Sequence, residues 1–271
     1  MADQGSWKLL NDRGGEGVIL AADFPATGRP EAGFAEFAPR IAPGLQLWET
    51  VPTGAGAPGA GSGADQVARW VDGLPGGDIP VVGVFGYCAG SVYAAALAEH
   101  VTKRQETAPA VVLFDPEAVS ELTLYWQFHK VVGNLSVVLS PTEVGDAQEA
   151  GKKAREENPE LVPFGAALDR IFQDVGRTAF ARAGLDAERS AELGGTFTAF
   201  VSYLTAATEI DYAAGWAAAT AITSRTETNG LNLARSNGRE DLIGREITFD
   251  IDHADLLRDE DVARTVLGLL G

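Results

Sequence analysis

The single cysteine of the chain, Cys88, lies in a stretch whose spacing is typical of an enzymatic nucleophile. In Gly86-Tyr87-Cys88-Ala89-Gly90 one glycine stands two positions before it and another two positions after it. This is the G-x-nucleophile-x-G pattern of a sharp turn from a strand into a helix, where larger side chains at the glycines would collide. The N-terminus of the helix favours an anion, which predicts a lowered pKa for the thiol. The alternative interpretation is a small buried cysteine in a glycine-rich turn.

A thiol nucleophile needs a base, and the chain has three histidines. His100 would lie about 18 Å along the helix from Cys88 at 1.5 Å per residue, which excludes it. His129 lies in a helical stretch, where packing or substrate lining is favoured. His253 follows the apolar stretch 245–251 and precedes the last helical pattern. We therefore predict His253 as the base.

The carboxylate that orients the base is expected between the nucleophile and the histidine, at the end of a strand. Asp115 meets this condition, since it follows the apolar stretch 109–114 and precedes Pro116. A turn or helix-capping aspartate is its alternative interpretation. Glu227 is the reserve candidate for the acid, and Asp241 is a weaker one.

The oxyanion of an acyl-transfer intermediate needs two backbone N–H donors. The residue after the nucleophile, Ala89, is predicted to supply one of them. The loop "DFPATG" (23–28), which follows the first strongly apolar stretch, is expected to supply the other. Ala26 and Thr27 are the candidates, and the choice between them stays open.

The elements that must position these residues alternate between strands and helices. The stretches 17–23, 45–50, 79–85, 109–114, 217–224 and 245–251 read as strands, and 33–42, 64–74, 91–101 and 259–270 read as helices. Continuous rather than alternating apolarity is typical of strands covered on both faces. The pattern predicts an α/β fold with a mostly parallel sheet and helices on both faces.

One long helical region, approximately 120–212, interrupts the alternation. We predict that it is an insertion within a single domain of residues 1–271 and that it forms a helical lid. Its apolar and aromatic side chains are candidates for lining an acyl pocket, although any one of them would equally well pack between helices. The candidates for substrate binding are Trp126, Phe128, Phe172 and Phe200 in this insertion, with Tyr87 beside the nucleophile.

The composition excludes several partners. A net charge of −17 argues against nucleic acid and anionic membranes, because both bind basic surfaces. The first residues lack the apolar core of a signal peptide, and no apolar run is long enough to span a membrane, so a cytoplasmic location is expected. Scattered histidines and one cysteine offer no metal-ligand spacing, and no metal is predicted.

The order of these motifs resembles the α/β-hydrolase thioesterases of nonribosomal peptide and polyketide assembly lines. The resemblance covers nearly the whole chain and is carried by "FPATG" (24–28), the cysteine turn, "VVLFDP" (111–116), the helical insertion and "HADLLRDEDVARTVLGLL" (253–270). It implies an α/β-hydrolase fold and a Cys-His-Asp triad. It also implies an acyl or peptidyl substrate on the phosphopantetheine of a carrier protein or of coenzyme A, with no bound cofactor. In free-standing editing members the acid often follows one strand later, which keeps Glu227 as an alternative.

The chain departs from this family at two positions. Most members carry serine at the position of Cys88, and Ser91 replaces a glycine that usually follows the elbow. A thioester on cysteine keeps more acyl-transfer potential than an oxoester, which favours transfer or cyclisation beside hydrolysis. The chain begins with Met and has no carrier domain, so a free-standing enzyme is expected.

Three alternatives remain open. One resembles the cysteine-dependent aminoacyl shuttles between carrier proteins, and another resembles dienelactone hydrolase, whose elbow reads "GYCxGG". The third is a catalytically silent hydrolase fold used as a scaffold. A sluggish Cys88 toward iodoacetamide near neutral pH would favour the scaffold.

Overall fold

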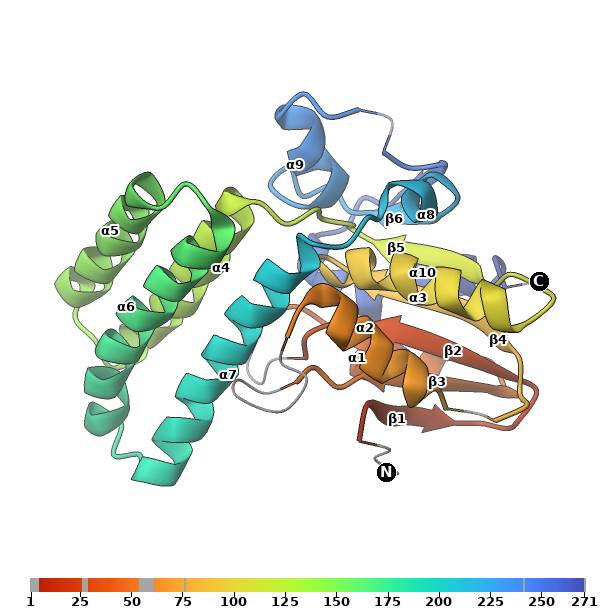
Figure 1. The fold of residues 1–271 in the computed structure, drawn as a ribbon, viewed down its shortest axis with the longest axis horizontal. Coiled ribbons are helices and arrows are strands. Elements are labelled where there is room, and N and C mark those ends of the chain that lie inside the picture. The colour runs from red at the N-terminus through yellow and green to blue at the C-terminus, as the bar shows by residue number, and fades with distance from the viewer. Residues whose placement is uncertain (1–4, 26–28, 54–60, 76, 241, 271) are drawn as a thin grey trace. The chain divides into compact units, whose positions relative to one another are not determined.

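The structure is a computed structural model that describes residues 5–25, 29–53, 61–75, 77–240 and 242–270 (Figure 1). The chain forms two compact units. The first is built from Met1–Pro52, Ser62–Ala118 and Glu209–Gly271, and the second is built around Val119–Thr208. The helical interruption seen in the sequence is therefore a compact unit, while its role as a lid remains a prediction.

The first unit contains a seven-stranded sheet in the described part of the chain, with strand order β1-β3-β2-β4-β5-β6-β7. Its strands are β1 (Trp7–Asp12), β2 (Gly17–Ala22), β3 (Leu45–Thr50), β4 (Val81–Tyr87), β5 (Ala110–Phe114), β6 (Thr220–Thr223) and β7 (Arg245–Thr248). Only β1 runs antiparallel to its neighbour, and all the other pairs are parallel. Each of the six stretches predicted as strands overlaps a strand, although the bounds differ, and β1 is an edge strand that the sequence analysis missed.

Helices cover the sheet on both faces. Figure 1 shows α2 (Gly63–Asp72) and α3 (Gly90–Arg104) in front of the sheet. On the other face, α1 (Phe34–Phe37), η3 (His253–Arg258) and α10 (Glu260–Leu267) share one core cluster with β2, β4 and β5. Rings of Phe34, Phe37, Phe85 and Phe114 pack at centroid distances of 5.8 to 6.3 Å in that cluster. This packing fixes the strand ends that carry the predicted site.

Three further short helices complete the first unit. They are η1 (Ala38–Arg40), α8 (Ala213–Ala217) and α9 (Gly230–Ser236). The stretch 217–224, predicted entirely as a strand, starts instead in α8, and only Thr220–Thr223 is extended. Its alanine-rich start suits a helix as well as a strand, so its apolarity alone did not separate the two.

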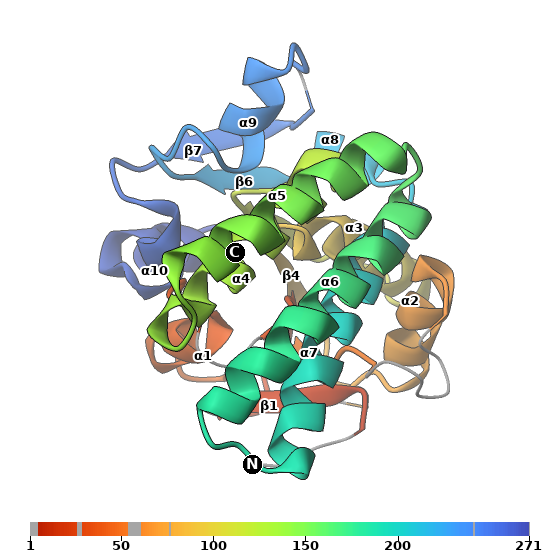
Figure 2. The ribbon, with the colours of Figure 1, turned by 90° about the vertical axis from the view of Figure 1, so that its left-hand side faces the viewer.

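The described helices of the second unit are α4 (Glu121–Asn134), η2 (Leu135–Val137), α5 (Pro141–Glu157), α6 (Leu161–Arg182) and α7 (Ala187–Ala207). Successive long helices pack against each other, as Figure 2 shows. Ser140 begins α5 with a reciprocal cap, because its hydroxyl accepts the Glu143 N–H at 3.3 Å and the Glu143 carboxylate accepts the Ser140 N–H at 2.9 Å. The interior of this unit contains Phe128, Phe172 and Phe197.

Candidate active site

Cys88 lies on a strained turn between β4 and α3. Its φ angle is +51°, a left-handed conformation that costs energy for any residue other than glycine. A Cβ at Gly86 would stand 2.5 Å from the Cα of Ser91, and a Cβ at Gly90 would stand 2.1 Å from the carbonyl oxygen of Ala22. Both glycines are therefore required by close backbone approach, as the elbow pattern predicts.

The turn occupies a favoured position in the sheet. β4 lies beside β2, and the chain reaches it only after running out to β3 on the other side of β2. At such a reversal of strand order, the carboxyl ends of neighbouring parallel strands leave a crevice in which ligands bind. Cys88 follows directly on the carboxyl end of β4.

Asp115 and His253 form a buried hydrogen-bonded pair. The Nδ1 atom of His253 lies 2.7 Å from Oδ2 of Asp115, and the other carboxylate oxygen accepts the Ser224 N–H at 2.9 Å. The Asp115 residue is fully buried, and 7% of His253 is exposed. A carboxylate can only accept here, so Nδ1 carries the proton and Nε2 is left as the atom that can take another. This is the arrangement of base and orienting acid in a nucleophile-His-Asp triad.

Hydrogen bonds donated by backbone N–H groups hold the two loops that bring Asp115 and His253 together. Asp115 follows β5 with a φ angle of +40°, and its N–H donates to the carbonyl oxygen of Ile222 at 2.9 Å. The His253 N–H donates to Oγ1 of Thr226 at 2.9 Å at the start of η3. Residues 138 positions apart thus meet at the ends of neighbouring elements.

The Nε2 atom of His253 is engaged by Tyr87 rather than by Cys88. The Tyr87 hydroxyl lies 2.9 Å from Nε2 and 3.1 Å from the carbonyl oxygen of His253. The two rings stack at a centroid distance of 4.9 Å and an angle of 17°. Tyr87, which the sequence analysis named for substrate binding, therefore contacts the predicted base directly.

The thiol of Cys88 donates instead to Glu117. Its Sγ atom lies 3.5 Å from Oε2 of Glu117, and the Glu117 N–H donates to the Cys88 carbonyl oxygen at 3.2 Å. Sequence reasoning missed Glu117, which lies two residues after Asp115 in the same turn. Its proximity to Asp115 in the sequence could have indicated it, because a turn that places Asp115 in the site also places the next few residues close to it.

The thiol pKa differs from the sequence-based expectation. Burial by the surrounding protein raises the pKa of Cys88 above its ordinary value, and the negative charge of Glu117 raises it further. A hydrogen bond from the Ala89 N–H lowers it, but not enough to compensate. The prediction of a lowered pKa was wrong because it considered only the helix N-terminus, and neither the burial of the thiol nor the charge of Glu117.

A second group of buried charges lies at the end of β2. Arg29 pairs with Asp23, with Nη1 3.0 Å from Oδ1, and its guanidinium lies 5.3 Å from the centre of the Tyr87 ring. Burial opposes the charge on Arg29, but Asp23 more than compensates, so the Arg29 pKa is raised. Glu49 on β3 is buried nearby, and this burial, with Asp23, raises its pKa to about 8.

The remaining predicted residues fall in several places. Ala89 lies directly after the elbow cysteine, where its N–H reaches Sγ. Ala26 and Thr27 lie outside the described residues, as does Asp241. Glu227 is exposed in the loop before α9, whereas Asp115 holds His253.

The candidate pocket residues of the second unit differ in exposure. Phe128 and Phe172 are buried, and Phe172 stacks on Phe197 at 4.0 Å. Trp126 is 50% exposed on α4, and Phe200 is partly buried on α7. Their contribution to an acyl pocket remains a prediction.

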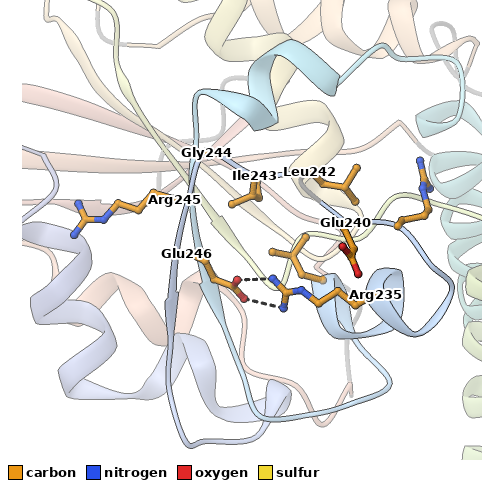
Figure 3. A pocket seen from close by; sticks show the side chains of 9 residues that line it. Arg235, Glu240, Leu242, Ile243, Gly244, Arg245 and Glu246 are labelled. Carbon is orange, nitrogen blue, oxygen red and sulfur yellow. Dashed lines mark hydrogen bonds and ion pairs between the residues drawn. The ribbon is translucent and has the colours of Figure 1, made fainter.

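A cavity of about 330 Å³ lies elsewhere in the first unit (Figure 3). Its lining includes none of Cys88, Asp115 and His253. Arg235 in this cavity is paired with both carboxylate oxygens of Glu246, at 3.1 and 2.5 Å. Its charge is neutralised within the protein, and the cavity is separate from the candidate site around Cys88, Asp115 and His253.

Among the described residues, no three His, Cys, Asp or Glu side chains gather as a metal site would require. None of the described helices has both the length and the apolarity that a membrane crossing demands.

Comparison with known proteins shows which solved structures share the fold of this chain. No protein-family model and no curated protein sequence matches the chain. Among solved structures, the Vlm2 thioesterase domain bound with a dodecadepsipeptide has a TM-score of 0.54 at 16% identity, over 97% of each chain. The NocB thioesterase domain from the nocardicin cluster has a TM-score of 0.55 at 13% identity, over 98% of this chain and 99% of that one. The enol-lactonase from Burkholderia xenovorans LB400 has a TM-score of 0.53 at 14% identity, over 97% and 95% of the two chains.

These similarities, with the mostly parallel sheet, establish the fold class. The chain has an α/β-hydrolase fold, as the sequence predicted. At identities of 13 to 16% the likeness concerns the fold alone. The activity has to be argued from the site.

Proposed function

We propose that this chain is an acyl-transfer enzyme of the thioesterase type with Cys88 as its nucleophile. The observation that carries the proposal is the buried Asp115–His253 pair beside a cysteine on a strained strand-to-helix elbow. Strain and burial of polar groups at one place are typical of functional sites, because both cost stability. Several solved structures of similar fold are thioesterase domains, which supports this reaction class.

The first half-reaction moves the acyl group onto the protein. Sγ attacks the carbonyl carbon of a thioester on a carrier protein or coenzyme A, while Nε2 of His253 takes the thiol proton. Asp115 accepts the Nδ1 hydrogen bond and stabilises the imidazolium. The oxyanion accepts the Ala89 N–H and a second amide from the 23–28 loop, for which Ala26 and Thr27 are candidates. The bond to the pantetheine sulfur then breaks, and that sulfur leaves with the proton from His253.

The resting hydrogen bonds define what must change before this step. Cys88 donates to Glu117, and Tyr87 holds Nε2. The proposed attack requires the thiol to leave Glu117 and to turn its proton toward Nε2 of His253. The Tyr87 hydroxyl keeps a partner during this change, because the His253 carbonyl oxygen lies 3.1 Å away.

The second half-reaction releases the acyl group. Water, an amine, an alcohol or another thiol attacks the Cys88 thioester, and His253 takes its proton and returns one to Sγ. A thioester intermediate stays reactive toward amines and thiols, so we propose transfer or cyclisation as the main outcome and hydrolysis as the side reaction. One similar structure is a four-domain nonribosomal peptide synthetase, of which the match covers 20%. This supports a carrier-bound donor.

Product analysis tests the proposal. Wild-type protein and Cys88→Ser are mixed with an acyl N-acetylcysteamine thioester and an amine or thiol acceptor, and products are separated by mass. We expect wild type to form the transfer product and the serine variant to lose transfer while keeping some hydrolysis. Equal loss of both reactions would remove the argument for transfer, and turnover that persists in Cys88→Ala would remove the cysteine mechanism.

A further inference from the structure

Glu117 is a buried carboxylate with no cationic partner in the described part of the chain. Only 6% of the residue is exposed. Its side chain takes one hydrogen bond there, from the thiol of Cys88 at 3.5 Å. A carboxylate removed from water without a cation costs several kcal/mol, so such a group usually has a functional reason.

Two other buried carboxylates near the site, Asp23 and Asp115, do have hydrogen-bonding or charged partners. Asp23 is also buried, but Arg29 forms an ion pair with it. Asp115 likewise has His253 and the Ser224 N–H as partners. Glu117 alone among these three acids points to the reacting sulfur and meets no positive charge in the described structure.

The backbone fixes Glu117 in that position. Its N–H donates to the Cys88 carbonyl oxygen at 3.2 Å, and the Cys88 N–H donates to the carbonyl oxygen of Phe114 at 2.9 Å. The β5 turn and the elbow are therefore joined on both sides of the nucleophile. The Glu117 side chain therefore extends from a backbone held beside the nucleophile, within reach of a group attached to Sγ.

We propose that Glu117 binds a protonated amine on the carbon next to the reacting carbonyl, so that the group carried by Cys88 is an aminoacyl group with a free amine. The inference rests on the proposed acyl transfer through Cys88. It narrows the substrate class, since the corresponding nitrogen of a peptidyl chain is acylated and carries no charge.

The geometry of an aminoacyl thioester fits this contact. Its nitrogen is three bonds from the sulfur, at roughly 3 to 4 Å with ordinary bond lengths. Oε2 of Glu117 lies 3.5 Å from Sγ, so an ammonium on the same side reaches hydrogen-bond distance. The ammonium replaces the thiol as the donor to Glu117 and supplies the missing positive charge.

Binding of the amine also prepares the nucleophile. In the resting site the Glu117 charge contributes to the raised pKa of Cys88. An ammonium beside Glu117 cancels that charge, and the displaced thiol is free to turn to His253. A substrate with the amine thus activates the cysteine that attacks it, whereas one without it does not.

The test compares two thioesters of nearly the same size. L-alanyl- and propionyl-N-acetylcysteamine are mixed with the full-length protein at about pH 6.5, below the ordinary pKa of an α-amino group. The rate of Cys88 acylation is followed by intact-protein mass. Wild type, Glu117→Gln and Glu106→Gln are compared, and the last variant, which changes an exposed carboxylate, is the matched control. The intrinsic reactivities of the two thioesters cancel when the alanyl-to-propionyl rate ratio is compared between proteins.

We expect the ratio to fall 10- to 100-fold in Glu117→Gln, the scale of a hydrogen bond to a charged group, and to stay unchanged in Glu106→Gln. N-acetylalanyl thioester should behave like the propionyl compound in wild type. An unchanged ratio, or an equal loss with both thioesters, would overturn the role of Glu117 while leaving acyl transfer in place. Absence of any adduct in wild type, with Cys88 still open to alkylation, would overturn the proposed function and this inference with it.

Discussion

Replacing Glu49 by glutamine should stabilise the protein at high pH but not at low pH. Glu49 lies on β3 between Lys8 of β1 and Ala21 of β2, and 2% of it is exposed. Burial raises its pKa to about 8, and Asp23 adds to this, while Lys8 and Arg29 act against it. The unfolded chain would ionise this group near its ordinary pKa of 4.5.

The size of the effect follows from these two values. A folded pKa above the unfolded one contributes stability that is fully present below about pH 4.5 and is lost as the pH rises to about 8. The difference of about 3.5 in pKa corresponds to roughly 5 kcal/mol at 1.36 kcal/mol per unit. This is a large share of the 5 to 15 kcal/mol by which proteins are ordinarily stable. Glutamine cannot ionise, so Glu49→Gln avoids the loss.

Urea unfolding of wild type and variant measures this difference at about pH 5, 6.5 and 8. We expect the advantage of Glu49→Gln to grow by up to about 1.4 kcal/mol per pH unit across the range. Glu106→Gln, which changes an exposed carboxylate, serves as the control and should follow wild type throughout. A variant that is less stable than wild type at pH 8, or a difference that does not depend on pH, would refute the reasoning.

Three further predictions concern the site itself. Alkylation of Cys88 by iodoacetamide should be slow at pH 7 and accelerate as the pH rises, because burial and the charge of Glu117 raise the thiol pKa. Slow alkylation therefore does not separate a resting enzyme from a silent scaffold, whereas acylation by a thioester does. Glu117→Gln should move the alkylation profile to lower pH, because removing the negative charge favours the thiolate; an unchanged profile in the variant would contradict this. Asp115→Asn should lower turnover about 10³- to 10⁴-fold with little change in substrate binding, since the amide no longer fixes the tautomer of His253. A loss of turnover below tenfold in steady-state kinetics would make another acid, such as Glu227, the orienting group. Tyr87→Phe should leave the stacked rings in place and free Nε2 of His253, so that the alkylation rate of Cys88 rises several-fold. The lost hydroxyl contacts should lower the unfolding free energy by about 1 to 3 kcal/mol. Slower alkylation would mean that the hydroxyl helps the base rather than competing with the thiol.

Local rules were sufficient for much of the fold and for the main residues of the candidate site. The elbow could be predicted because its glycines are required by close backbone contacts, within the motif and with β2. Asp115 and His253 could be predicted because loops after parallel strands meet at one edge of the sheet, and their chain order was informative. The Asp115–His253 contact at 2.7 Å agrees with that expectation.

What the sequence did not provide depends on partners distant in the chain. The edge strand β1, with the sequence WKLLND, mixes apolar and polar residues without a clear period, and it is defined by its pairing with β3. The raised pKa of Cys88 depends on burial and on Glu117, 29 positions away, whereas the helix N-terminus is visible locally. The hydroxyl of Tyr87 meets His253 across 166 positions, so no spacing rule could have indicated it.

The central claim is that an acyl group passes through Cys88, and intact-protein mass spectrometry tests it most directly. Wild type and Cys88→Ala are mixed with a panel of acyl and aminoacyl N-acetylcysteamine thioesters, and the masses are recorded over time. The account predicts a mass gain equal to one acyl group in wild type, absent in the alanine variant. A wild-type protein that turns over a thioester without this gain, or an alanine variant that still acquires the acyl group, would contradict it.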